Sequence, residues 1–595
     1  MEKNFSGINK IFKIEFFEKI KSYIKDGTFR SVFEDWKWIF RYTKNNKNKI
    51  LIYTLLGILS STMALVYSYI SRTLINVVTE KQTDKMVLII AAYFFTAFFT
   101  ITLKNIVNRY FCKFNITVKN EIQKEIFENI MDSDWLSMNQ FSNGDIVNRF
   151  DNDVELIANY AIKWIPDLIV LLYTFFVTLI VMLKMDPIMA LIALLSAPFL
   201  LLMSKFVVKK MREYQKASKE MQSKMMAFAV ETFYNTDIIK SFGIIKNSTK
   251  KLVGWQKKNE DVLLESNMFE IKTNIATSII SFCVSATAFG YCLFRLWQGV
   301  IKYGDMSFFL SRRSTLSASF KSLIEMVPQI IASAVAASRV RELVELKHEQ
   351  HDNESLTAIK KVSQNGLTVR MDNVSFRYND EKYVYENGCF VAKPNEIIAL
   401  LGPSGEGKTT MLRLILALIH PESGEITLEG NDGVKYIMNA DMRSLFSYVP
   451  QGNTMLSGSI ADNLRLIKPE ATDEEIIDAL KMSCAWEFVC NLPDGINSLV
   501  GEKGKGLSEG QAQRVAIARA ILNDAPVLLF DEATSALDEE TEANVLKNII
   551  FRRPDKTCIV STHRKSVLKQ CNRIYVIKDR KTEEYKSLEE YVNSQ

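Results

Sequence analysis

The first half of the chain carries long apolar runs separated by charged stretches. Six of these runs are candidate membrane spans, over residues 50–72, 86–106, 161–183, 187–207, 275–297 and, in a more polar form, about 308–336. The first five are each close to the ~20 apolar residues that a helix needs to cross a bilayer. The pattern therefore predicts an α-helical transmembrane domain of six spans within residues 41–345.

The connections between the runs indicate how the chain is oriented. An even number of spans places both ends on one side of the membrane, and basic stretches near 104–124 and 205–224 lie on that side. Because basic loops stay in the cytoplasm, we predict cytoplasmic N- and C-termini in a multi-pass protein of a bacterial plasma membrane. The two inner connections are about fifty residues or longer, so they should contain helices of their own.

Residues 1–40 precede the first span and are basic. Apolar residues recur at every fourth position from Ile8 to Ile24, with lysines between them. A basic amphipathic helix of this kind suits an anionic membrane surface. A helix that packs against the rest of the protein has the same pattern, so both interpretations stay open.

The sixth run is too polar to face lipid. Arg313, Ser317, Lys321 and Glu325 follow one another at four-residue steps. A charge at mid-bilayer costs about 2.5–3.5 kcal/mol on insertion scales, so this helix should face a watery cavity or partner charges. Arg312 or Arg313 could meet an anionic cargo. The simpler alternative is that both reach the outer interface or pair with Asp305, since they lie within ~12 Å of the outer end.

The second half of the chain has the pattern of an α/β domain, over residues 367–595, after a polar stretch, 346–366, interpreted as a linker. The apolar run 397–401 predicts a buried strand, and 411–418 predicts an apolar helix face. Between them, residues 402–410 read Gly-Pro-Ser-Gly-Glu-Gly-Lys-Thr-Thr and match the P-loop pattern at all its fixed positions. A glycine-rich turn is the alternative, but the flanking strand and helix favour a nucleotide site.

The chemistry of a P-loop assigns roles to these residues. Glycines let backbone N–H groups close around a phosphate, and the next helix presents its positive end to the same phosphates. Lys408 would reach the β- and γ-oxygens, and Thr409 would ligate Mg²⁺. The predicted ATP-binding residues here are Gly402, Ser404, Gly405, Gly407, Lys408, Thr409 and Thr410.

A second apolar run, 527–530, ends in Asp531 and Glu532. In P-loop NTPases an aspartate at the end of such a strand holds Mg²⁺, which is the role predicted for Asp531. Glu532 is placed to polarise the attacking water as general base. The sequence thus predicts an α/β P-loop NTPase, with ATP and Mg²⁺ as cofactors, fused to the membrane domain.

Composition removes two other classes. The net charge is +6, and no surface pattern of basic and aromatic residues indicates nucleic-acid binding. The eight cysteines are scattered without a C-x-x-C pair and there are four histidines, so a structural zinc site is not expected.

Taken together, the six spans, the short outer loops and the two long inner loops, fused to a nucleotide-binding domain, resemble an exporter-type (type IV) half-transporter of the ATP-binding cassette (ABC) family. Residues 141–149 with Asp153 resemble the first intracellular loop of that family, and 231–242 resembles the region of the second coupling helix. Segment 501–504 resembles an exporter-specific segment that touches the coupling helices. The resemblance runs from about residue 35 to the C-terminus.

The resemblance implies roles for further residues of the α/β domain. The signature motif, usually L-S-G-G-Q, matches Leu-Ser-Glu-Gly-Gln at 507–511. The implied roles are these: Tyr378 stacks on adenine; Gln451 links Mg²⁺ and water to the coupling helices; Ser508, Gly510 and Gln511 cap the γ-phosphate bound on the opposite subunit; Asp538 belongs to the D-loop; and His563 is the switch histidine. Taken singly, Tyr378 could be a core aromatic and His563 a loop residue. Glu509 departs from the motif, and its charge would repel a γ-phosphate unless the side chain points away.

The predicted function is an ATP hydrolase that drives export through the membrane as a dimer, by alternating access. A homodimer is the simplest case because Glu532 and His563 are both kept, and a related half-transporter is the other possible partner. The polar sixth run favours an amphipathic or anionic cargo, such as a peptide natural product, a lipid or a drug. The alternatives are an importer on the same fold and an ATP-gated channel or regulatory subunit, against which an intact Glu532 argues.

Overall fold

The structure is a computed structural model in two units, and each is described separately. It describes residues 37–42, 44, 46–161, 163–194, 196–363, 366–378, 382–403, 405–452, 454–501, 504, 506–552 and 555–594. Unit 1 comprises the chain up to Glu128 together with Asn143–Glu345, and unit 2 comprises Asn129–Ser142 together with Leu346–Gln595. The predicted amphipathic helix, up to residue 36, and Ser404 of the P-loop lie outside the described residues.

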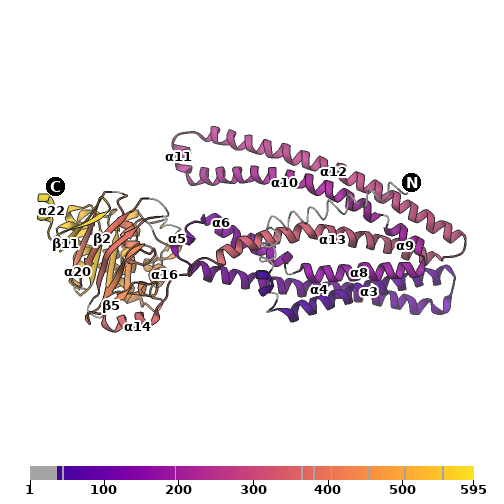
Figure 1. The fold of residues 1–595 in the computed structure, drawn as a ribbon, viewed down its shortest axis with the longest axis horizontal. Helices are drawn as coiled ribbons and strands as arrows, with labels where there is room; N and C mark the ends of the chain where they lie inside the picture. The colour runs from indigo at the N-terminus through magenta and orange to yellow at the C-terminus, as the bar shows by residue number, and fades with distance from the viewer. Residues whose placement is uncertain are drawn as a thin grey trace. The chain divides into compact units, whose positions relative to one another are not determined.

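Unit 1 is helical (Figure 1). Its elements are α3 (Lys47–Thr79), α4 (Thr83–Met131, whose last residues belong to unit 2), α6 (Asn143–Asn148), the π-helical turns η1 (Arg149–Asp153) and η2 (Ile157–Ala161) around α7 (Val154–Leu156), α8 (Trp164–Met185), α9 (Pro187–Leu194), α10 (Ser196–Tyr234), α11 (Thr236–Ser241), α12 (Ile245–Trp297) and α13 (Tyr303–Val344). Helices α10 and α12 lie side by side, and α3, α8 and α13 pack together. The long inner connections therefore contain helices, as their length predicts.

Four helical stretches among the described residues are long and apolar enough to cross a membrane. They are Lys47–Thr79, Asp84–Met131, Asn143–Met185 and Ile245–Trp297, which contain the first, second, third and fifth predicted spans. The fourth predicted span falls on α9 and the start of α10, and the sixth falls on α13, a helix of 42 residues. The helical membrane domain is thus confirmed as a fold class, and the count of six spans stays a prediction.

The surface of α4 shows which side of a span meets lipid. Phe94, Phe95 and Phe98 are each 67% or more exposed, so these rings have no protein partner around most of their surface. Apolar side chains in this number on one helix indicate a face that lies against acyl chains. The interior of the unit is apolar as well, with a buried cluster on α8, α9, α12 and α13 that includes Met182, Cys292 and Phe309.

Unit 2 contains two principal sheets. The first is antiparallel in the order β2-β1-β4-β5, formed by β1 (Thr368–Phe376), β2 (Tyr385–Ala392), β4 (Ser423–Glu429) and β5 (Lys435–Ile437). The second has the order β12-β11-β3-β10-β9-β6, formed by β3 (Ile397–Leu401), β6 (Phe446–Val449), β9 (Val527–Asp531), β10 (Thr557–Ser561), β11 (Arg573–Lys578) and β12 (Lys581–Tyr585). All pairs of the second sheet are parallel except β11 with β12. A two-residue pair, β7 (Gly458–Ser459) and β8 (Leu499–Val500), stands apart.

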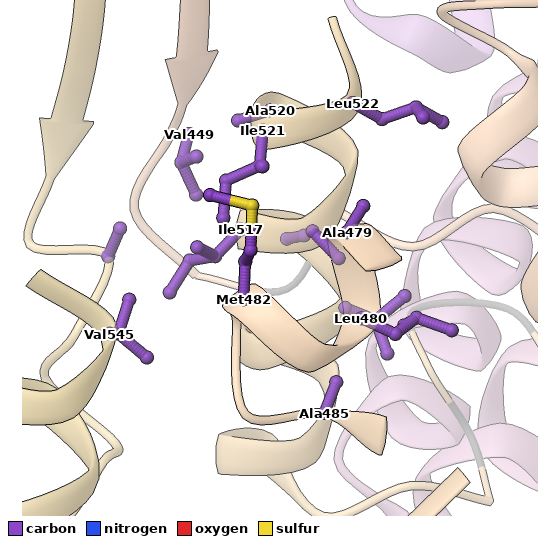
Figure 2. Packing of buried hydrophobic residues seen from close by; sticks show 14 of the residues in the cluster. Val449, Ala479, Leu480, Met482, Ala485, Ile517, Ala520, Ile521, Leu522 and Val545 are labelled. Atoms are coloured by element: carbon purple, nitrogen blue, oxygen red, sulfur yellow. The ribbon is translucent and has the colours of Figure 1, made fainter. Parts of the chain in front are cut away.

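Helices cover these sheets and complete two cores. They are α5 (Trp135–Met138), α14 (Asn353–Val362), α15 (Lys408–Ile415), η3 (Asp441–Leu445), α16 (Ile460–Arg465), α17 (Asp473–Met482), α18 (Trp486–Val489), η4 (Gly495–Asn497), α19 (Glu509–Leu522), α20 (Glu539–Arg552), α21 (Lys565–Leu568) and α22 (Leu588–Ser594). One core joins α17 and α19 to the second sheet, and Ile517, Leu480 and Val449 are among its buried residues (Figure 2). The other fills the space between the two sheets with residues such as Ile398 and Phe390. The α/β nucleotide-binding fold is confirmed.

The stretch interpreted as a linker contains a helix. In α14, the Asp352 side chain accepts hydrogen bonds from the Ser355 N–H at 3.1 Å and its hydroxyl at 2.6 Å, which caps the first turn. Ile359 is fully buried in the core between the sheets. The spacing of Leu356, Ile359 and Val362 carried this signal, because apolar residues three apart share one helix face.

Candidate nucleotide-binding site

Four predicted site segments follow the carboxyl ends of four neighbouring parallel strands. The P-loop follows β3, His563 follows β10, Glu532 follows β9 and Gln451 follows β6, and these strands are adjacent in the order β3-β10-β9-β6. Ligands of open α/β sheets bind at this edge. Segments 155 residues apart in sequence are thereby brought together, as in Lys408 and His563, with 2.6 Å between Nζ and Nε2.

The P-loop depends on glycine at two positions for steric reasons. A Cβ on Gly407 would lie 2.7 Å from Val384 Cγ1, and the residue has φ +111°, a left-handed conformation. A Cβ on Gly402 would lie 2.7 Å from the carbonyl oxygen of Ile577. Gly407 is also the residue before α15, so the loop turns directly into the helix whose N-terminus is suited to a phosphate.

Lys408 lies at the centre of the site. Its ammonium donates to the Gly402 carbonyl at 2.7 Å and to His563 Nε2 at 2.6 Å, and it lies 3.6 Å from Glu532 Oε1. Glu532 in turn accepts a hydrogen bond from Gln451 Nε2 at 2.8 Å. The predicted phosphate lysine, general base, switch histidine and Q-loop glutamine therefore form one connected network. A polyphosphate would provide the anionic oxygens that such a lysine binds.

Glu532 has an uncommon backbone conformation. Its φ is +49°, and its N–H donates to the carbonyl of Ser561, at the end of the neighbouring strand β10, at 3.2 Å. Non-glycine residues rarely adopt this region, and doing so costs of order 1–3 kcal/mol. Such strain clusters at functional sites, and here it aims the carboxylate beyond the end of β9.

Asp531 fits the role of a magnesium ligand. The residue is 1% exposed, and its Oδ2 has no hydrogen-bond partner among the described residues. Burial is the main cause that raises the pKa of this carboxyl, while the Thr409 hydroxyl opposes the rise and the Glu532 charge adds to it. Burial also raises the pKa of the neighbouring Tyr448 to about 12, with the Asp531 charge as a second cause. A divalent cation would satisfy the uncompensated carboxylate oxygen beside Thr409.

The signature motif lies at the start of α19. Ser508 Oγ accepts from the Gln511 N–H at 3.2 Å, and Gln511 Oε1 accepts from the Ser508 N–H at 2.9 Å, which is a capping box. Gly510 passes so close to the D-loop that a Cβ would lie 2.8 Å from the Ala536 carbonyl oxygen. Ser508 and Glu509 are exposed. Among the described residues, no hydrogen bond or ion pair joins these two to the P-loop of the same chain.

Two residues that the sequence did not single out hold the D-loop. Gln513, 2% exposed, accepts from the Ala536 N–H at 3.0 Å and donates to Ser535 Oγ at 3.3 Å. Arg564 donates to the Ser535 carbonyl at 2.6 Å. Arg564 is the residue after His563, so its hydrogen bond connects the segment of the switch histidine to the D-loop. Asp538 caps α20, accepting from the Thr541 N–H at 2.9 Å, and this bond is the main cause that lowers the pKa of Asp538.

The Tyr378 side chain contacts both the core between the two sheets and the P-loop helix α15. Its ring packs edge-on against Phe376, with 4.9 Å between centroids, and its hydroxyl lies 3.2 Å from Thr410 Oγ1. Half-buried beside the P-loop helix, it is near enough to the P-loop for the predicted adenine contact. That role stays a prediction.

In unit 1, the region resembling the first intracellular loop forms a charge network. Arg149 contacts Asp145 at 2.8 Å and Glu342 at 2.6 Å, while Arg339 contacts Asp145 at 2.6 Å and Asp153 at 3.1 Å. The network joins α6 and η1 to the C-terminal end of α13. The region resembling the second coupling helix contains α11, flanked by Phe233 and Phe242, which are 76% and 77% exposed.

In the polar run, Arg312 has a partner that the sequence did not suggest. Asp305 forms its ion pair with Arg72 of α3. Arg312 is 9% exposed, donates to Ser68 Oγ at 2.6 Å and lies over the Phe308 ring. Its Nε has no hydrogen-bond partner among the described residues, and the same holds for Nε of Arg313. The pair with Asp305, one of the alternatives for these arginines, is therefore wrong for Arg312, whose guanidinium contacts a hydroxyl.

Comparisons with known proteins agree with this architecture. The model of the ABC transporter transmembrane region matches residues 50–320, and the ABC transporter model matches residues 386–535. A Staphylococcus aureus (strain NCTC 8325) protein, whose name proposes it as a multidrug export ATP-binding/permease protein, is 27% identical over 77% of this chain and 79% of its own. YfiC of Bacillus subtilis (strain 168), an uncharacterised ABC transporter ATP-binding protein, is 25% identical over 77% and 75%. A bacterial Atm1-family ABC exporter solved with ATP bound has a TM-score of 0.77 at 20% identity, covering 93% of this chain and 97% of that one.

The fold and site define an ATP-hydrolysing domain fused to a helical membrane domain. The chain belongs to the ABC transporter family, as an exporter-type half-transporter that carries both domains on one polypeptide. It binds ATP, and its hydrolysis of ATP is coupled to transport across the membrane.

Proposed function

We propose that two copies of this chain form the working exporter and share each ATP between them. One observation carries the proposal: Ser508 and Glu509 are exposed at the start of α19, while the P-loop and its partners are assembled elsewhere on the same sheet. A helix N-terminus that presents a serine and a glycine is suited to a γ-phosphate held by another chain. Mg²⁺, held by Thr409, Gln451 and Asp531, would neutralise the charge that develops during transfer.

The chain's own residues then divide the work of hydrolysis. Lys408 binds the phosphate oxygens, Glu532 accepts a proton from the attacking water, and Gln451 and His563 orient it through the contacts described above. Closure of the two nucleotide-binding units on ATP would pull on the inner loops, and the Asp145–Arg149–Arg339 network would pass that movement to α13. The membrane cavity would then open to the outside, and hydrolysis would reset it.

A complementation experiment tests the shared site. Two variants, Lys408→Ala and Ser508→Arg, are placed in a Glu532→Gln background, co-expressed with different affinity tags, and purified through both tags. If sites are shared, each mixed dimer has one intact P-loop facing one intact signature. It should retain ATP after rapid gel filtration, whereas neither variant alone should. Equal, low retention in all three preparations would refute the shared site.

The direction of transport and the orientation follow from the same proposal. The nucleotide-binding unit and the N-terminus would lie in the cytoplasm of a bacterium, at the plasma membrane. Inside-out vesicles should then take up cargo when Mg-ATP is added outside. ATP-dependent loss of preloaded cargo from such vesicles would indicate an importer, and steady ion current would indicate a channel.

For the cargo, we propose an amphipathic molecule with an anionic group. Arg312 supports this class, because a buried guanidinium within a membrane helix is costly unless an anion meets it during the cycle. Phe308 and the surrounding apolar residues would accept the hydrophobic part. Lysophosphatidic acid, as anionic probe, should stimulate ATP hydrolysis in nanodiscs more than tetraphenylphosphonium, and Arg312→Gln should remove the difference. Lys302→Gln, at the exposed outer end, is the matched control. Stronger stimulation by the cation would reverse the proposal.

A further inference from the structure

The inner-loop segment, Asn129–Ser142, belongs to the nucleotide-binding unit by its contacts. Backbone bonds join it to the start of the second stretch of that unit. The Asp134 N–H donates to the Lys347 carbonyl at 2.7 Å, and the Glu349 N–H donates to the Asp132 carbonyl at 3.0 Å.

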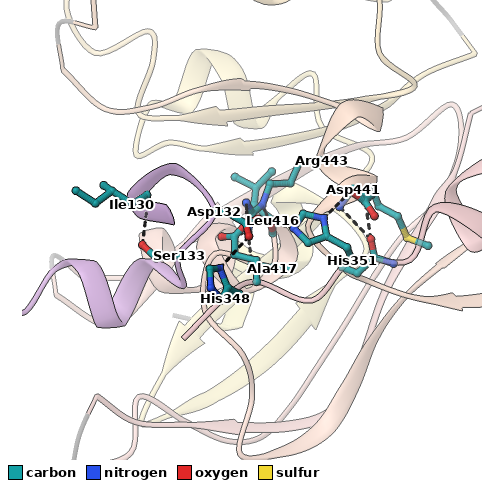
Figure 3. A network of polar contacts seen from close by, with 12 residues as sticks. Ile130, Asp132, Ser133, His348, His351, Leu416, Ala417, Asp441 and Arg443 are labelled. Atoms are coloured by element: carbon teal, nitrogen blue, oxygen red, sulfur yellow. Dashed lines mark hydrogen bonds and ion pairs between the residues drawn. The ribbon is translucent and has the colours of Figure 1, made fainter. Parts of the chain in front are cut away.

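A histidine lies between two carboxylates at this junction (Figure 3). His351 Nε2 is 2.7 Å from Asp132 Oδ1 of the inner-loop segment, and its Nδ1 is 2.7 Å from Asp441 Oδ1 of η3. His348 Nδ1 lies 2.9 Å from the other oxygen of Asp132. The imidazole of His351 thus bridges the inner-loop segment and the body of the nucleotide-binding unit.

The geometry requires a charged ring. A neutral imidazole has one N–H, whereas an ionised carboxylate only accepts, so both contacts of His351 are satisfied only in the imidazolium form. The hydrogen bond with Asp441, followed by that with Asp132, raises the pKa of His351. The hydrogen bond with His351 is likewise the main cause that lowers the pKa of Asp132.

The signs of these shifts define a pH window. The pKa of His351 is raised in the folded protein, so its contribution is fully present below the ordinary value of about 6.5 and is lost as pH rises through the folded pKa. Asp132 has a lowered pKa, so its contribution is present above its ordinary value and is lost as pH falls through the lowered one. The bridge is therefore complete in mildly acidic solution and weakens on the alkaline side.

Other charged groups surround His351 at this junction. The charged groups that the structure describes around His351 include Asp132, Asp441, His348, Glu349, Arg443 and the adjacent Asp352, whose N–H donates to Asp441 Oδ2 at 2.8 Å. Arg443 holds Glu349 with bonds of 2.5 and 2.8 Å and also donates to the carbonyls of Leu416 and Ala417. A guanidinium is not deprotonated in proteins, so the pH dependence of the bridge is attributed to His351.

The bridge holds the inner-loop segment against the P-loop helix. Trp135 of α5 packs against the core between the sheets, and the Arg413 guanidinium lies 4.5 Å from the centre of its ring. Arg413 belongs to α15, which begins at Lys408. At the other end, the segment begins within α4, the helix that contains the second predicted span. The chain of α4 thus continues directly into a segment that packs on the P-loop helix of the nucleotide-binding unit.

We propose that His351 is a positioning residue whose imidazolium form fastens the inner-loop segment to the nucleotide-binding unit, so that the fastening loosens as pH rises. The consequence for coupling between ATP turnover and transport rests on the proposed function above. The attachment of the segment by His351 does not rest on the proposed function, and a separate measurement tests it.

Hydrogen exchange of the full-length protein in nanodiscs tests the fastening. The observed amides are Asp134 and Glu349, with rates corrected for the intrinsic pH dependence of exchange. In the unmodified protein, protection should fall as pH rises, with a midpoint above about 6.5. His351→Gln should lose this step. His351→Arg should keep protection at high pH, since arginine stays charged and can donate to both carboxylates.

His420→Gln is the matched control, because His420 takes no part in this cluster, and it should keep the full pH step. Asp441→Asn provides a second route, since losing one carboxylate should move the midpoint to lower pH. An unchanged step in His351→Gln, or no step in the unmodified protein, would overturn the proposal. So would loss of the step in His348→Gln but not in His351→Gln. If transport assays fail while the exchange results hold, the proposed function is at fault and the fastening stands.

Discussion

The replacement Glu532→Gln separates chemistry from binding at the nucleotide site. An amide has the size of the carboxylate, and its oxygen can still accept from Gln451 Nε2, which lies 2.8 Å from Glu532 Oε2. What is lost is a group that can take a proton from water. General-base catalysis contributes about 10²–10⁴-fold, which corresponds to ~2.7–5.4 kcal/mol of barrier. We therefore expect hydrolysis to fall by that factor.

The same substitution should leave the fold and ATP binding intact. The Glu532 side chain is 27% exposed, and the repulsion with Asp531 is relieved. The buried Lys408 ammonium loses a carboxylate at 3.6 Å but keeps its hydrogen bonds with the Gly402 carbonyl and His563 Nε2. Phosphate release by protein in nanodiscs at saturating Mg-ATP measures the turnover, and ATP retention after rapid gel filtration measures binding. Glu540→Gln, an exposed acid in the first turn of α20, is the control. Hydrolysis by Glu532→Gln at the unmodified rate would refute the assignment of the general base.

Three further substitutions probe the same site. Glu509→Gly removes an exposed carboxylate from the first turn of α19 and should raise ATP turnover or ATP affinity. The increase should be up to about fivefold, for a screened repulsion of ~1 kcal/mol between Glu509 and the γ-phosphate. No change in turnover or affinity would show that this repulsion is absent. Asp531→Asn should raise the melting temperature in EDTA, because a carboxyl whose pKa is raised by burial destabilises the fold when it is ionised. The same substitution should abolish the stabilisation by Mg-ATP. A lower melting temperature in EDTA would contradict this reasoning. Gly407→Ala forces a Cβ to 2.7 Å from Val384 at φ +111° and should cost about 1–3 kcal/mol. In a filter assay, ATP binding should therefore be about 5- to 150-fold weaker, and unchanged affinity would show that the loop can shift.

The sequence predicted those features that depend on local chemistry. The P-loop, Asp531 and Glu532 carry their signal within a few residues, because phosphate and Mg²⁺ demand particular groups at fixed spacing. The predictions of an ABC exporter-type half-transporter and of a helical membrane domain fused to an α/β domain are confirmed. The roles of individual site residues, the domain boundaries and the dimer stay predictions.

The missed features are contacts between distant segments. His351 meets Asp132 across 219 positions, and Asp305 pairs with Arg72 across 233, so no local pattern announces either contact. Gln513 looks like any polar helix residue until the D-loop is seen to pass beside it. The grouping of the inner-loop segment with the nucleotide-binding unit also depends on tertiary packing of Trp135, which hydrophobic patterning cannot place.

The left-handed backbone conformation of Glu532 creates a trade-off between stability and activity at one position. Glycine or asparagine would relax that conformation, and neither could serve as a general base. If selection for transport were lost, substitutions to glycine or asparagine should therefore accumulate early at position 532. The protein would gain thermal stability as its ATP turnover disappears. Natural chains with asparagine or glycine at this point would then be stable, ATP-binding and inactive, descended from working pumps.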